Sequence, residues 1–95
     1  MMSFFDGLSL FEDEGSITVH EGRIRCRLAT PNHSQINEFS ILFGIGKVTK
    51  QIQHKTDLYV WGVDGKKAKE FLFRLLPWLS GKRREQALMA MGGNL

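Results

Sequence analysis

The chain has 95 residues, a formal charge of +3 at pH 7 and 42% apolar residues, which suits one domain with a single core. No apolar run approaches the length of a membrane span, and the first residues lack the basic start and long apolar stretch of a signal peptide. The one cysteine, Cys26, excludes an internal disulfide and a cysteine-based zinc site. We therefore expect a single intracellular domain, whose basic charge leans toward nucleic acid as a partner.

The chain begins with an apolar segment that leads into acids. Phe4, Leu8 and Phe11 recur at helical spacing and Leu10 widens their face, so a short buried helix is expected here. Carboxylates at the end of a helix do not stabilise it, because the macrodipole is partly negative there. The segment nevertheless closes with three acids and a glycine, Glu12-Asp13-Glu14-Gly15.

Two interpretations of this acidic end are open: a solvated turn, or carboxylates that converge on a cation. The first fifteen residues contain no Lys or Arg, whereas all 13 Lys and Arg follow them, together with six of the ten acids. A metal-dependent phosphodiester site needs carboxylates to hold a hard cation and basic groups to hold phosphates. The distribution of charge therefore favours the cation site.

Residues 16–20 and 23–29 alternate strictly and predict a hairpin with a turn at Glu21-Gly22. Its inward positions are apolar: Ile17, Val19, Ile24, Cys26 and Leu28. Its outward positions are polar: Ser16, Thr18, His20, Arg23, Arg25 and Arg27. A ribbon rich in donors and poor in carboxylates suits base edges and phosphates in a DNA groove, and a merely solvated strand is the alternative.

A second helix is expected after Asn32, which would cap it together with Gln35. Its apolar face comprises Ile36, Phe39, Ile41, Leu42 and Phe43, and Gly44 ends it. The next strand, 47–53, places Lys47, Thr49, Gln51 and Gln53 on one face. Its return strand, 58–63, is apolar on both faces, so the pattern leaves its orientation open; Tyr59 and Trp61 are expected in the core.

Two helices complete the chain. Asp64 is expected to cap the first, which carries a stripe of Ala68, Phe71, Leu72 and Leu75. Ser80 is expected to cap the second, which spans about 81–91. The predicted order is αββαββαα: an α+β domain with a four-stranded antiparallel sheet, helices on one face, and the other face open and basic.

The residues around the acidic end resemble a known family. Leu8-Ser9-Leu10-Phe11-Glu12-Asp13-Glu14-Gly15-Ser16-Ile17 is similar to the signature helix of the LAGLIDADG homing endonucleases. Residues 44–46, 59–68, 75–79 and 82–87 resemble the family's later elements, including its proline-aromatic-leucine corner. The resemblance extends from Leu8 to Met89 with the element order intact. Ser9, Glu12 and Asp13 depart from the family's pattern.

The resemblance implies a catalytic set. Glu14 corresponds to the metal-binding carboxylate, and the backbone carbonyl of Asp13 to a further metal oxygen. Lys82 matches a lysine near the active site, and Asn32 lies near a polar position that orders water. The implied cofactor is Mg²⁺ or Mn²⁺, and the implied reaction is hydrolysis of phosphodiesters in double-stranded DNA.

The resemblance also implies a homodimer, because two signature helices pack side by side in this family. The interface residues expected from this are Phe4, Leu8, Ser9, Phe11 and Glu12. Two-fold symmetry then predicts a near-palindromic DNA target. The side chains expected on the DNA are Thr18, His20, Arg23, Arg25, Arg27, Lys47, Thr49, Gln51 and Gln53.

Two other functions are open at this point. One is a module of the same fold that binds DNA or intron RNA without cutting it. The other is a scaffold domain whose basic sheet contacts an acidic protein.

Overall fold

The computed structural model describes residues 1–52 and 55–92, and it confirms the α+β prediction and the αββαββαα order. The elements are α1 (Phe4–Glu14), β1 (Gly15–His20), β2 (Arg23–Thr30), α2 (His33–Phe43), β3 (Lys47–Ile52), β4 (Asp57–Asp64), α3 (Gly65–Leu75) and α4 (Gly81–Ala90).

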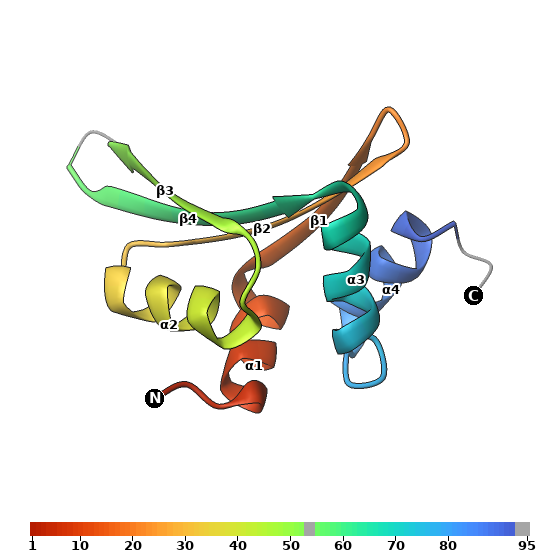
Figure 1. Ribbon diagram of the computed structural model, residues 1–95, viewed down its shortest axis with the longest axis horizontal. Coiled ribbons are helices and arrows are strands. Elements are labelled where there is room, and N and C mark those ends of the chain that lie inside the picture. The colour runs from red at the N-terminus through yellow and green to blue at the C-terminus, as the bar shows by residue number, and fades with distance from the viewer. Residues whose placement is uncertain (53–54, 93–95) are drawn as a thin grey trace.

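The four strands form one antiparallel sheet in the order β1-β2-β4-β3. The two hairpins therefore meet through their second strands, β2 and β4, which lie at the centre. All four helices lie on one side of this sheet, and its other side is uncovered and curves upward at both hairpins (Figure 1). No helix within the described ranges has the length and apolar character to cross a bilayer.

Aromatic rings fill the space between sheet and helices. Trp61, Phe11, Phe39 and Phe71 are fully buried and pack in edge, tilted or stacked contacts with ring centroids 4.9–6.5 Å apart. Burial of such large apolar side chains is the main stabilising contribution to a domain of this size. The sheet and the helices are therefore held together by one aromatic core.

Trp61 settles the orientation of β4, which the sequence left open. Its indole faces the helices and donates a hydrogen bond of 2.9 Å from Nε1 to the Ile45 carbonyl. Gly46 fits beside it because any Cβ there would lie 2.6 Å from Trp61 Cε2, and its φ of 90° also favours glycine. By alternation Val60 and Gly62 face the uncovered side. The core placement of Trp61 is confirmed, and Tyr59 packs partly against the same core.

Two predicted core residues lie outside it. Ile41 is 74% exposed and Val19 is 49% exposed. In α2 the buried residues are Ile36, Phe39 and Phe43, a narrow stripe whose far side carries Ile41. Val19 lies near the β1–β2 turn, where the hairpin extends beyond the helices (Figure 1).

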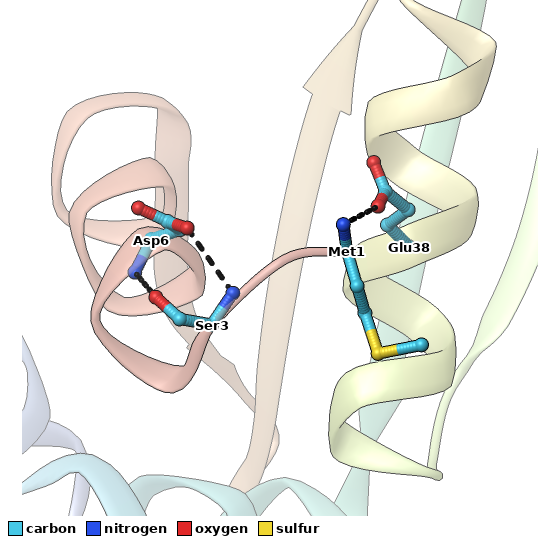
Figure 2. Close-up of polar contacts among 4 residues, drawn as sticks. All are labelled: Met1, Ser3, Asp6 and Glu38. Carbon is cyan, nitrogen blue, oxygen red and sulfur yellow. Dashed lines mark hydrogen bonds and ion pairs between the residues drawn. The ribbon is translucent and has the colours of Figure 1, made fainter.

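The start of α1 is fixed by a capping box that the sequence reading missed. The Asp6 amide donates to Ser3 Oγ and the Ser3 amide donates to Asp6 Oδ2, both at 3.1 Å (Figure 2). These bonds lower the pKa of the Asp6 carboxyl, chiefly through the Ser3 backbone. The terminal amine of Met1 lies 3.7 Å from Glu38 on α2. The helix is thus anchored at its start, and its acidic end runs straight into β1.

Two of the predicted helix caps lack the expected side-chain hydrogen bond. Neither Asp64 nor Ser80 makes a side-chain hydrogen bond to the helix that it precedes, although both occupy the N-cap position. Each side chain has a partner elsewhere: Asp64 pairs with Arg25, and the Ser80 hydroxyl donates to Glu12.

Candidate nucleic-acid interface and acidic helix end

The residue that follows the acidic end of α1 must be a glycine for steric reasons. Glu14 is the last residue of α1 and Gly15 opens β1. A Cβ on Gly15 would overlap the Phe11 carbonyl oxygen and lie 2.5 Å from the Phe11 ring. Phe11 is fully buried and has no room to move. The glycine after the acids therefore lets the chain turn from helix to strand directly over Phe11.

The carboxylates at this end are available to a ligand. Asp13 and Glu14 are exposed, and neither is in an ion pair with a described residue. Within residues 1–52 and 55–92, no three His, Cys, Asp or Glu side chains gather as a metal cluster. Mg²⁺ is commonly bound through one or two carboxylates plus waters and substrate phosphates. Two adjacent acids at a helix end fit that pattern, with the remaining ligands coming from outside one chain.

Lys82 belongs to a helix that is tied to this acidic end. It is the second residue of α4 and is exposed. The Glu12 carboxylate accepts hydrogen bonds from the Ser80 amide (2.9 Å) and the Ser80 hydroxyl (2.6 Å). The structure therefore joins the start of α4 to the last turn of α1, which ends in Glu14.

Asn32 is not placed with Glu14. Its Oδ1 accepts the Gln35 amide at 3.0 Å, so the predicted cap of α2 is present. The Gln35 side chain accepts from buried Thr30 Oγ1 at 3.2 Å rather than returning to Asn32. Asn32 shares a surface hollow with Met1 and Asp6, which lie at the opposite end of α1 from Glu14. The structure gives Asn32 a capping role and does not support it as a catalytic partner of Glu14.

The uncovered face of the sheet carries the predicted polar side chains in cross-strand rows. Thr18 lies opposite Arg25, which lies opposite Asp64; Arg27 lies opposite Gly62, which lies opposite Lys47. Residues directly across an antiparallel sheet share a face. Two adjoining hollows are lined by these residues, with Thr49 and Val60 in the first and His20 and Arg23 in the second. Gln51 follows Thr49 on the same face of β3, and Gln53 lies outside the described residues.

The charge on this face is predominantly positive. Arg25 pairs with Asp64 at 3.9 Å, whereas Arg23, Arg27 and Lys47 make no ion pair within the described part of the chain. Gly62 lies between Arg27 and Lys47, and a Cβ on it would have ordinary contacts at 3.9 Å and beyond. The result is a hollow with no side chain over Gly62 and a cation on each flank. Sequence reasoning missed Gly62, Val60 and Asp64 because residues 58–63 show no clear alternation.

Part of the predicted dimer interface is wrong. Leu8 is 5% exposed and Phe11 is fully buried, so both are covered by their own chain. Phe4 is half-buried against Phe43 and Trp78. The Glu12 carboxylate is directed to Ser80. Of the predicted set, Ser9 is exposed on α1.

Comparison with solved structures agrees with this fold. An archaeal intron-encoded homing endonuclease, I-Vdi141I, complexed with DNA matches with a TM-score of 0.68 and 21% identity, over 87% of this chain and 60% of that one. The homing endonuclease I-CvuI, in complex with the I-CreI target in 2 mM Mg with the DNA not cleaved, matches with a TM-score of 0.65 and 19% identity, over 88% and 60%. The fold is that of the LAGLIDADG homing endonucleases.

The chain spans 60% of the length of both structures. No family model matches the sequence, and the search of curated proteins found no match. The likeness is therefore one of fold at low sequence identity.

Proposed function

We propose that this domain is a site-specific endonuclease for double-stranded DNA that acts as a homodimer with Mg²⁺ or Mn²⁺. The observation that carries the proposal is the direct junction of α1 and β1 at Glu14-Gly15. Gly15, which follows the carboxylates of Asp13 and Glu14, opens the edge strand of a sheet whose uncovered face carries Arg23, Arg27 and Lys47, and this supports a site that the acids and the cations share. Phosphodiester hydrolysis needs this combination, because the metal ligands and the phosphate-binding cations must meet on one surface.

The roles of the residues are those that the resemblance implies, and they are chemically consistent. Glu14, with the Asp13 backbone carbonyl, would hold the divalent ion. Such an ion polarises the scissile phosphate and lowers the pKa of an attacking water. Lys82 would offset the negative charge that develops on the phosphate. The cations of the sheet would hold the DNA backbone, and Thr18, Thr49 and Gln51 would meet base edges in a groove.

The homodimer is proposed because one chain offers too few ligands. Asp13 and Glu14 are adjacent, and no third ligating side chain joins them among the described residues. A second copy related by a two-fold axis at α1 would bring a second acidic end and a second sheet. Two identical sheets side by side would read a near-palindromic target. The two structural neighbours bound to DNA support a duplex as the ligand.

The test is selection of cut sites from a random duplex library in Mg²⁺. We expect the wild type to cut a subset of sequences and Glu14→Gln to lower the cutting rate by about 100-fold or more, while its DNA affinity in EDTA is kept. Glu70→Gln on α3, the same change at an exposed acid, should cut like the wild type. Salt-sensitive DNA binding without cutting in any divalent ion would instead indicate the non-cleaving module. Equal cutting by Glu14→Gln and wild type would refute the assigned role of Glu14.

A further inference from the structure

The contact between Glu12 and Ser80 joins two elements that are far apart in the sequence. One carboxylate oxygen, Glu12 Oε2, accepts from both the amide and the hydroxyl of Ser80, at 2.9 and 2.6 Å. Among the hydrogen bonds of the described residues, these are the two that link α1 to the start of α4. Bonds to an ionised acceptor are about twice as strong as neutral ones. The contact is therefore a tether between these two helix ends.

The tether also explains the unusual cap of α4. The side chain of Ser80, at the N-cap position, makes no hydrogen bond to its own helix and is directed to Glu12, while the Ser80 carbonyl accepts the Arg84 amide of α4. A carboxylate near a helix N-terminus is stabilised by the macrodipole, whereas one at a C-terminus is not. Glu12 belongs to the C-terminal turn of α1 but directs its charge to the N-terminus of α4. The position that is unfavourable for α1 is thus used to anchor another helix.

The tether lies close in the chain to two residues that have roles in the proposed reaction. Glu14 comes two residues after Glu12, and Lys82 comes two residues after Ser80, with Gly81 between them in the left-handed region at φ 56°. Lys82 is exposed and makes no ion pair within the described ranges. No ion pair to a described residue therefore holds its ammonium group. Its location depends on where α4 begins, and the Glu12–Ser80 contact links that point directly to the last turn of α1.

We propose that Glu12 is a positioning residue that holds the Lys82-bearing start of α4 against the acidic end of α1. This inference rests on the nuclease function proposed above. It gives Glu12 a role within one chain, in place of the interface role expected from the sequence. The alternative is a cap that contributes only to stability.

A double-mutant cycle separates the two roles, measured as single-turnover cutting with DNA saturated by protein. We expect Glu12→Ala to slow cutting about tenfold while DNA affinity in EDTA stays within about twofold, a change in the range of coupled residues. In a Lys82→Ala background, Glu12→Ala should change the rate by less than about twofold, because the residue it positions is gone. Glu12→Gln, which keeps an acceptor oxygen, should recover part of the rate. Glu85→Ala, an exposed acid on α4, should leave the rate unchanged.

Amide hydrogen exchange gives a readout without cutting. The Ser80 amide should exchange faster in Glu12→Ala than in the wild type, with the amides of β2 unchanged. An equal loss of rate from Glu12→Ala with and without Lys82 would overturn the positioning role, as would an unchanged rate or unchanged Ser80 exchange. A wild type that cuts no DNA would overturn the nuclease and this role together, whereas a wild type that cuts while the cycle shows no coupling would overturn this role alone.

Discussion

Asp64 lies directly opposite Arg25 in the sheet, and the two side chains form a 3.9 Å ion pair on the uncovered face. Both are about half exposed, so the pair contributes little to stability. The pair matters instead for the proposed binding of DNA phosphates. An acid among Arg23, Arg27 and Lys47 repels phosphate and occupies Arg25, so it should lower the affinity of this face for the proposed duplex ligand, regardless of sequence.

Replacing Asp64→Asn should therefore raise affinity for random duplex DNA. We expect a roughly threefold gain at low salt, and a plot of log affinity against log salt that is steeper by up to about 1, because Arg25 becomes free to neutralise a phosphate. Fluorescence anisotropy over a salt series measures both. Asp57→Asn is the matched control, since Asp57 pairs with Lys50 on the opposite face of the sheet. A weaker binder would contradict the inhibitory role of Asp64.

Arg27 and Lys47 flank the hollow over Gly62 and should act as separate phosphate contacts. Arg27→Gln and Lys47→Gln should each weaken binding about equally for all sequences and lower the salt slope by about 1, and the double variant should lower it by about 2. Lys50→Gln is the control, because Lys50 alternates to the opposite face of β3. An equal effect of Lys50→Gln would show that net charge, rather than this face, sets the affinity.

The sequence predicted most of this face but little of what joins the elements. Strict alternation over residues 23–29 placed the arginines on the correct face of the sheet. In a strand with one buried face, the apolar residues must all point to that face, so the alternating polar residues point outward. The spacing of Leu8 and Phe11 showed an apolar stripe on α1 but not whether the chain's own sheet or a partner covers it. The contact of Glu12 with Ser80 spans 68 residues, and no local pattern encodes it. The orientation of residues 58–63 became clear only from the hydrogen bond between Trp61 and Ile45 in the structure.

Gly15→Ala should destabilise the domain. The added Cβ overlaps Phe11, whose ring is packed on all sides, so Phe11 or the helix end must shift. We expect a loss of about 1–3 kcal/mol in the free energy of unfolding, the usual cost of overpacking. Gly62→Ala is the comparison, since a Cβ there meets only ordinary contacts and should change stability by less than about 1 kcal/mol. Urea denaturation of both variants measures the difference, and equal stabilities would contradict the steric explanation of Gly15.

Cys26 should make the fold sensitive to alkali. Burial raises the pKa of its thiol from an ordinary 9.0 to about 12. The folded state therefore keeps a proton that the unfolded state loses, and stability should fall as pH rises from about 9 toward 12. Cys26→Ala should be less stable at neutral pH because it leaves a cavity, but its stability should decline less over that range. Thermal unfolding between pH 8 and pH 11 gives the comparison, and parallel declines would exclude the thiol as the cause.

The proposed homodimer should depend on the outward face of α1 rather than on Leu8 and Phe11. Phe5, Ser9 and Asp13 are exposed at successive helical turns, and Phe5 meets exposed Trp78 edge-on at a centroid distance of 5.6 Å. Buried aromatics commonly dominate an interface, so Phe5→Asp should raise the dimer dissociation constant about tenfold or more. Ile41→Asp, which changes a 74% exposed apolar residue on α2, should leave it unchanged. Sedimentation equilibrium measures both, and a dimer that tolerates Phe5→Asp but not Ile41→Asp would place the interface on α2.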